Sequence, residues 1–290
     1  MKRGKSRRLF KKKKSHSNQR LGCIIAIIVL IPICYGLYLY YQQYSVQHSS
    51  KPQIETSVSL PTPSGKDLEI PISLIPRQEQ IIRHKGYTVS YNKDLKIPNW
   101  VSYELTRQET KGKEKRGDNF IADPLVKGAI ATNADYARSG YDKGHMAPAA
   151  DMKWSPDVMK ESFYFSNMCP QHPQLNRRGW KNLEEKIRDW AVADSAIIII
   201  CGPIIDKPSK TIGKNKVAVP ERFFKVILSP FVKPARGIGF LFNNRQAVEP
   251  LSTYAVSIDS IEKLTHMDFF SPLPDEIENA VEANADYYQW

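Results

Sequence analysis

The sequence is poor in cysteine, with four among 290 residues, and this limits the chemistry that it can carry. Two of the four lie in the apolar run 21–41, which leaves Cys169 and Cys201 for the rest of the chain. Two cysteines cannot form a disulfide framework, although a single Cys169–Cys201 bond in an oxidising compartment stays open. Cys169 and His172 form a C-x-x-H pair, but no second such pair accompanies it, which argues against structural zinc.

The chain also lacks a strongly basic folded part, despite its formal net charge of +12. Residues 1–20 contain ten Lys or Arg and no acidic residue, so the remaining 270 residues hold 32 basic and 30 acidic side chains. Net charge therefore gives no support for a nucleic-acid-binding domain, because the excess that would attract phosphates lies in the tail. A local basic groove elsewhere stays open.

Residues 21–41 lack any charged side chain. At ~1.5 Å per residue such a run is long enough to cross a ~30 Å hydrocarbon core as a helix, so it predicts a transmembrane span. Ten basic residues precede the span and only Lys51 occurs in the twenty residues after it, which predicts a cytoplasmic N-terminus and an extracytoplasmic domain, periplasmic or at the cell surface. A cleaved signal peptide is disfavoured by the length of the run and the lack of a cleavage motif, and a mitochondrial targeting segment is a third alternative.

The composition divides the chain into four segments. Residues 1–20 form a basic cytoplasmic tail, residues 21–41 the transmembrane helix, residues 42–78 a Pro- and Ser-rich linker, and residues 79–290 a folded domain that starts near Ile81. The linker composition is typical of an extended tether that would hold the domain away from a bilayer.

The pattern within the domain predicts an α+β fold with mainly antiparallel strands. The β-rich runs Tyr87–Tyr91 and Trp100–Leu105 predict an antiparallel pair, and the isoleucine run at 195–205 predicts a strand buried on both faces. Further strand candidates lie at 216–220, 223–228 and 237–242, and a charged surface loop is expected at 107–124.

One helix is predicted at 175–193, starting between Asn176 and Gly179. Apolar residues recur in it at spacings of three and four, which places them on one face toward the core. These residues are Trp180, Leu183, Ile187 and Trp190. Asn176 and Glu184 then lie on or beside one edge of the helix.

Four polar residues are candidates for chemistry, although each has an ordinary structural interpretation. His145 follows Asp142 by three residues with a glycine between them, which could orient an imidazole or simply make a turn. Asn176 could be a helix cap, and Glu184 a solvated helix residue. The residues alone therefore indicate an acid/base histidine with amide and carboxylate oxygens available for a hard cation.

The order of three motifs resembles the DNA/RNA non-specific endonucleases, the ββα-metal (His-Me finger) nucleases that include endonuclease G. DKGH at 142–145 is similar to the family's Asp-Arg-Gly-His, SNMCPQ at 166–171 to its Ser-Asn-x-x-Pro-Gln, and LNRRGWKNLE at 175–184 to its Leu-Asn-x-x-x-Trp-x-x-Leu-Glu. The likeness covers roughly residues 84 to 275. It implies a central, mostly antiparallel sheet flanked by helices.

The resemblance also implies a role for each candidate residue. His145 would be the general base that deprotonates water, Asn176 the single direct protein ligand of Mg²⁺ or Mn²⁺, and Glu184 the group that holds the metal-bound waters. These roles suit phosphodiester hydrolysis, which needs a nucleophile from water and a charge sink for phosphate oxygens. Asp142 would position the histidine motif. Lys143 stands where the family usually has Arg. The compact ammonium of lysine there replaces a planar guanidinium, which can bind a phosphate through two parallel hydrogen bonds.

A second phosphate-binding residue, Arg116 or Arg138, is expected from the segment before the motif. The resemblance implies DNA and RNA as substrates and a homodimer as a candidate assembly, since relatives often dimerise. Contact with the membrane through residues 21–41 is predicted from the uncharged run itself. Two rival hypotheses stay open: a catalytically weak nuclease-like domain that binds nucleic acid or an envelope partner, and a phosphodiesterase for another substrate.

Overall fold

The structure is a computed structural model that describes residues 68–205 and 210–290. The predicted transmembrane span 21–41 lies outside these residues. Within the described ranges, no helix has the length and apolar character needed to cross a membrane.

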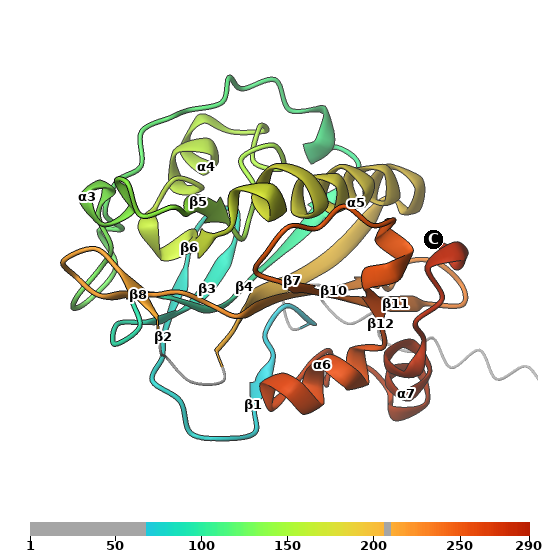
Figure 1. The fold of residues 1–290 in the computed structure, drawn as a ribbon. Coiled ribbons are helices and arrows are strands. Elements are labelled where there is room, and N and C mark those ends of the chain that lie inside the picture. Colours follow the sequence, from blue (N-terminus) through green and yellow to red (C-terminus); the bar gives the residue numbers. More distant parts are fainter. Residues whose placement is uncertain (1–67, 206–209) are drawn as a thin grey trace, which may run out of the picture. The chain divides into compact units, whose positions relative to one another are not determined.

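A seven-stranded antiparallel sheet forms the centre of the described part (Figure 1). From one edge to the other its strands are β12 (Ala255–Val256), β11 (Arg236–Asn243), β10 (Arg222–Ser229), β7 (Ala196–Ile204), β4 (Ile97–Thr106), β3 (Thr88–Asn92) and β2 (Gln80–Arg83). The isoleucine-rich β7 is the middle strand, with Ile197 and Ile199 in the core of one face and Ile198 and Ile200 in the core of the other. The prediction of a strand buried on both faces is confirmed, as is the antiparallel β3–β4 pair.

The face of the sheet with Ile197 and Ile199 carries the predicted helix and a short β-ribbon. The ribbon pairs β5 (Asp142–His145) with β6 (Met168–Gln171), and the helix α5 (Lys181–Asp194) follows it after a π-helical turn at Leu175–Trp180. The shorter helices α3 (Asn133–Tyr136) and α4 (Pro156–Glu161) lie on the same side of the sheet (Figure 1). The apolar stripe of α5 packs into this core as predicted, because the residues that recur at helical spacing are all buried.

The opposite face carries α6 (Ile258–Thr265), α7 (Asp275–Ala283) and the two-stranded pair β1 (Ile72–Ser73) with β13 (Met267–Asp268). Residues 68–78 fall within the segment expected to be linker, yet Leu68 is 1% exposed and β1 pairs with β13. The packed part therefore begins earlier than Ile81. Local composition does not reveal this, because the partner strand lies far along the chain.

The remaining elements are short. β8 (Thr211–Ile212) pairs with β9 (Val217–Ala218), so the strand predicted at 216–220 belongs to a small separate hairpin. Single 3-10 turns occur at Glu109–Lys111, Phe165–Asn167, Leu251–Tyr254 and Tyr287–Gln289. Cys169 and Cys201 are buried free thiols, so the alternative of a disulfide between them does not hold in this structure.

Candidate active site

The ribbon β5–β6 places the DKGH residues on two faces in alternation. Lys143 and His145 share one face, where both contact the ring of Phe120, while Asp142 points to the start of the π-helical turn. Gly144 lies opposite Cys169, and a Cβ atom there would be 2.3 Å from Gln171 Oε1. The glycine of the motif is thus required by close packing of the two strands.

The imidazole of His145 is buried between aromatic rings. The side chain is 7% exposed, its ring meets Phe163 edge-on at a centroid distance of 5.0 Å, and its Nε2 atom has no hydrogen-bond partner. Burial and, to a smaller extent, the charge of Arg116 lower the pKa of His145 to about 3. His145 is therefore neutral at pH 7, and a neutral imidazole has one unprotonated ring nitrogen, as a proton acceptor requires.

Asp142 orients the side chain of Asn176. Its Oδ2 accepts hydrogen bonds from Asn176 Nδ2 at 2.9 Å and from Arg177 Nε at 2.8 Å, and its Oδ1 accepts from Arg177 Nη2 at 2.7 Å. Burial alone would raise the pKa of Asp142, but the bonds from Arg177 and Asn176 outweigh it and lower this pKa below its ordinary value. Because an ionised carboxylate only accepts, the Asn176 amide must turn its NH₂ toward Asp142, which leaves Oδ1 as its remaining polar atom.

The helix that carries Asn176 is joined to the histidine strand at a second point. Trp180 Nε1 donates to the backbone carbonyl of His145 at 3.2 Å in the buried interior. The π-helical turn is therefore bonded to both ends of β5, at Asp142 and at His145. This holds the candidate base and the candidate metal ligand in a fixed relation.

Glu184 lies one turn into α5, above a buried polar group on the sheet. Burial raises the pKa of Glu184 to about 7 against the charge of Lys225, while Asp151 raises it further. Lys225 is fully buried on β10, with its Nζ 4.4 Å from the centre of the Trp180 ring and without a hydrogen-bond partner. Asp151 accepts from Arg188 Nη1 at 2.8 Å and from the Tyr103 hydroxyl at 2.9 Å.

Two basic side chains lie over the aromatic rings that surround His145, Lys143 over Phe120 and Arg116 over Phe163. Lys143 Nζ lies 4.2 Å from the centre of the Phe120 ring and donates to Asn133 Oδ1 at 2.9 Å, and burial lowers its pKa. Arg116 is exposed above the Phe163 ring at 5.7 Å, and its charge acts on both His145 and Glu184. No comparable interaction brings Arg138 to the site within the described residues, so Arg116 is the better placed of the two candidates.

A surface cleft opens beside these residues. Its lining is Phe120, Asn133, Tyr136, Ala137, Tyr141, Asp142, Lys143 and Asn176. The cleft thus presents the amide of Asn176 and the cation of Lys143 together, which is a suitable arrangement for a phosphate and a metal ion.

Sequence comparisons identify the family of the chain. The profile of a family described as DNA/RNA non-specific endonuclease matches residues 64–276. The chain belongs to this family. A nuclease of Nostoc sp. (strain PCC 7120 / SAG 25.82 / UTEX 2576) is 30% identical over 250 residues, which cover 81% of this chain and 88% of the relative. Mitochondrial endonuclease G of Homo sapiens is 33% identical over 213 residues, 67% of this chain and 71% of the relative.

The fold of this endonuclease domain is also similar to a solved relative. A structure described as the EndoG/EndoGI complex, which concerns the mechanism of EndoG inhibition, superposes with a TM-score of 0.64 at 29% identity. The match covers 69% of this chain and 89% of that one. The resemblance inferred from the three motifs is confirmed, together with the α+β fold and its central antiparallel sheet.

Several residues around the endonuclease site are not predicted from the sequence. Phe120 and Phe163 enclose His145, and Lys225 lies beneath Glu184, yet each belongs to an ordinary apolar or strand segment. Lys225 has one signal in the sequence, since it is the single charged residue within the apolar strand 223–228.

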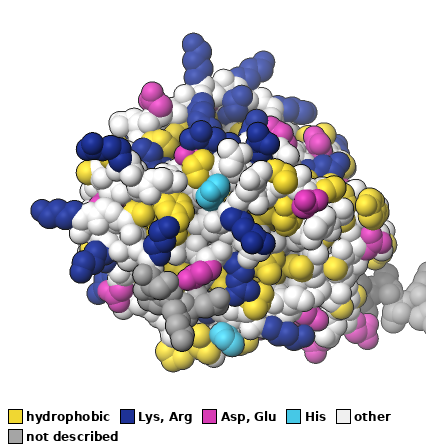
Figure 2. Space-filling view, viewed as in Figure 1, with side chains coloured by type: hydrophobic (Ala, Val, Ile, Leu, Met, Phe, Trp, Pro, Cys, Tyr) yellow, Lys and Arg dark blue, Asp and Glu magenta, His cyan; other side chains and the backbone are white. Residues whose placement is uncertain are grey.

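The endonuclease domain is locally basic near the site, although its net charge is almost neutral. Figure 2 shows Lys and Arg side chains gathered over the part of the molecule that carries α3, α4 and the preceding loop. The exposed basic residues of that loop are Arg107, Lys111, Lys113, Lys115 and Arg116. A charged strip of this kind can attract a polyanion without a net basic domain.

Proposed function

We propose that the chain is a metal-dependent endonuclease that hydrolyses phosphodiester bonds of DNA and RNA without sequence specificity. The observation that carries the proposal is the double link between β5 and the π-helical turn. Asp142 binds Asn176, and Trp180 binds the carbonyl of His145, so a neutral base and an oxygen ligand are held on one rigid unit. A protein that only binds nucleic acid needs neither.

The donor set of the site fits Mg²⁺ or Mn²⁺. Asn176 keeps Oδ1 for a cation because its NH₂ is bonded to Asp142, and Glu184 offers a carboxylate from the same helix. One protein oxygen and several waters are typical of magnesium sites. A bound Mg²⁺ supplies positive charge to the phosphate oxygens and to the leaving group. Asn176 would hold it directly, and Glu184 would hold its waters.

The other residues then have separate tasks in the proposed reaction. His145 takes a proton from the attacking water, and its buried, neutral state keeps Nε2 available for this step. The incoming phosphate brings negative charge next to His145, which favours the protonated imidazole once it forms. Lys143 lines the cleft and Arg116 lies over the Phe163 ring that contacts His145, so both cations are available for phosphate oxygens.

We also propose that the domain is anchored to a membrane by residues 21–41 and acts outside the cytoplasm. The uncharged run and the ten basic residues before it support this orientation. Such a location would separate a non-specific nuclease from the genome. Protease added outside intact spheroplasts should digest the domain. A domain that stays fully protected from the added protease would refute the placement.

The nuclease activity is tested with full-length protein purified in detergent. Supercoiled plasmid and single-stranded RNA are incubated with the protein and Mg²⁺ or Mn²⁺, and nicking is followed on gels. We expect cleavage of both substrates, and a loss of about 10²–10⁴-fold in His145→Ala, the range for removal of a general base. The matched control is His266→Asn, because His266 is exposed at the end of α6 and Asn tolerates its positive φ of 53°.

Each result separates the hypotheses. No cleavage with any divalent ion, from protein that binds DNA, would support the weak nuclease-like binding domain. Hydrolysis of a small phosphodiester without cleavage of either polymer would support the second rival. Full activity in a folded His145→Ala variant would reject the assigned base.

A further inference from the structure

Five carboxylates gather on the face of the sheet opposite the candidate active site. They come from α6 (Asp259 and Glu262), β13 (Asp268) and α7 (Glu278 and Glu282). They form two overlapping groups of three, and in each group the carboxylate oxygens lie within 4.8 Å of one another. Glu282 belongs to both groups, so its carboxylate lies at the centre of the cluster.

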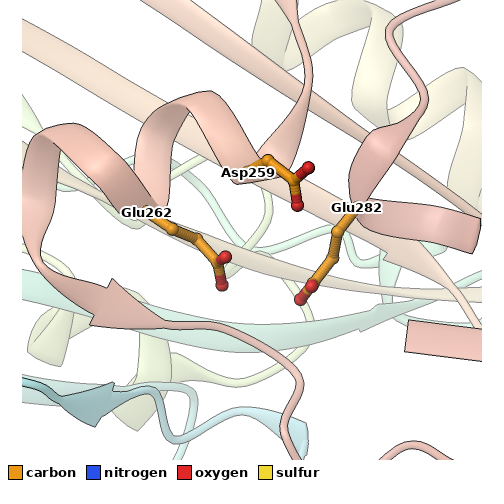
Figure 3. Close-up of side chains that lie close together, drawn as sticks. All are labelled: Asp259, Glu262 and Glu282. Atoms are coloured by element: carbon orange, nitrogen blue, oxygen red, sulfur yellow. The ribbon is translucent and has the colours of Figure 1, made fainter. Parts of the chain in front are cut away.

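Glu282 is the residue that distinguishes this cluster from ordinary surface acids. Its side chain is 7% exposed, and its Oε1 atom is buried without a hydrogen-bond partner. Figure 3 shows it reaching from α7 toward Asp259 and Glu262, so that the three side chains converge on one space between the helices. A buried carboxyl oxygen with no donor is unfavourable unless a ligand satisfies it.

The cluster has almost no compensating donors in the described residues. None of the five carboxylates takes part in a salt bridge there, and Glu262 Oε1 accepts a hydrogen bond from the backbone N–H of Phe269 at 2.8 Å. Burial, followed by the charges of Glu262 and its acidic neighbours, raises the pKa of Glu282 to about 9. The electrostatics thus call for a proton or a cation.

We propose that this cluster is a binding site for a hard divalent cation, Ca²⁺, held by Glu282 with carboxylates of α6, β13 and α7. The donors are all carboxylate oxygens, which suit hard cations, whereas zinc and copper sites usually contain sulfur or nitrogen ligands. Ca²⁺ takes six to eight oxygens in flexible geometry and accepts bidentate carboxylates, whereas Mg²⁺ keeps most of its waters. Two adjoining groups of three acids that share one buried member therefore fit Ca²⁺ better.

The site would add an ionic link between elements that already pack together in one hydrophobic cluster. α6 and α7 lie side by side below the sheet, and β13 follows α6 directly and pairs with β1. A cation bound by all three would therefore also stabilise β1, where the chain enters the packed part after the linker segment. The site is separate from the catalytic one, since the two lie on opposite faces of the sheet, and the inference does not depend on the proposed nuclease activity.

The test is a calcium titration of the full-length protein in detergent, after EGTA treatment and exchange into metal-free buffer. Thermal unfolding is followed with and without CaCl₂, and binding is measured by calorimetry. A site of this kind should raise the Tm of the wild-type protein by about 5–10 °C at a Ca²⁺ concentration of 100 times Kd. Binding at pH 7 should also release protons, seen as a dependence of the heat on the buffer, because the buried carboxyl must ionise.

Matched variants locate the effect. Glu282→Gln keeps the size of the side chain and should lose most of the Tm rise and at least tenfold in Ca²⁺ affinity. Glu276→Gln removes the same charge from an exposed position of α7 and should behave as the wild type. Asp259→Asn is a second, less buried variant that should also weaken Ca²⁺ binding if Glu282→Gln does not fold.

The catalytic metal site must be excluded as the source. Asn176→Ala should retain the full Ca²⁺-dependent Tm rise, because Asn176 lies on the other face. A rise that disappears in Asn176→Ala and persists in Glu282→Gln would overturn the proposal. So would a wild-type protein whose Tm depends on pH and not on Ca²⁺, since protonation alone would then satisfy Glu282.

Discussion

Gly144→Ala is expected to destabilise the ribbon that carries the candidate base. The added methyl group would lie 2.3 Å from Gln171 Oε1, 2.6 Å from Gln171 Cβ and 2.8 Å from Gln171 Cδ, whereas ordinary contacts start at 3.4 Å. The neighbouring strand must therefore move by roughly 1 Å, since Gln171 Cβ is fixed by the backbone and cannot rotate away from the added methyl group.

Overpacking of this kind costs about 1–3 kcal/mol. For a domain of this size the cost corresponds to a fall in Tm of about 2–12 °C, which thermal and urea unfolding can measure. The activity should fall as well, because a shift of β5 against β6 displaces His145 from the turn that carries Asn176.

A second variant tests the reason for the loss. Gln171→Gly removes all three atoms that the methyl group would strike, and its two amide atoms have no hydrogen-bond partners to leave behind. In the double variant the cost of Gly144→Ala should shrink by about 1 kcal/mol or more, seen as a coupling energy between the two sites. Strictly additive effects, or a Gly144→Ala protein as stable as the wild type, would refute the steric argument.

Three further predictions concern the charged groups of the site. Asp142→Asn should reduce Mg²⁺ affinity or activity by about 10–100-fold, because the neutral amide has one acceptor oxygen where Asp142 uses two to orient Asn176 and bind Arg177, while the exposed Asp157→Asn should not. Burial raises the pKa of Glu184 to about 7 in the folded state. The free energy of unfolding should therefore fall as pH rises from about 4.5 to 7, by at most about 3 kcal/mol. Urea titrations at several pH values should show a smaller dependence on pH in Glu184→Gln. Lys143→Arg should raise kcat/KM on DNA roughly two- to tenfold through bidentate phosphate contact, and an unchanged or lower value would show that Lys143 is suited to this cleft.

The parts predictable from the sequence are those with a strong local pattern. The isoleucine run indicated β7, and the 3–4 spacing of Trp180, Leu183 and Ile187 indicated α5, because burial on both faces or on one face leaves a direct trace in the order of residues. The order of motifs indicated the family, because each motif forms a separate part of the site: the first two contain the strands of the β5–β6 ribbon, and the third forms the start of the helix that follows.

The parts that were missed depend on contacts between distant residues. The pairing of β1 with β13, and the position of Lys225 beneath Glu184, arise only when separate segments come together. The carboxylate cluster at Glu282 is a similar case, because its members come from three elements and none is unusual in its own helix or strand. The roles of His145, Asn176 and Glu184 stay predictions until the variants are measured.

The π-helical turn at Leu175–Trp180 makes chain length a component of the site. A π turn holds one residue more than the corresponding α turn. Deleting one residue between Asn176 and Trp180 would allow the segment to wind as a regular α-helix, which turns about 100° per residue. Every side chain of the site would survive such a deletion, and the direction of Asn176 relative to Glu184 would change little, because the tighter α winding restores most of the rotation lost with the deleted residue. A segment of full length wound as a regular α-helix would instead turn Asn176 away from its present direction. The number of residues between Asn176 and Trp180 and the π winding therefore determine together where the candidate metal ligand points.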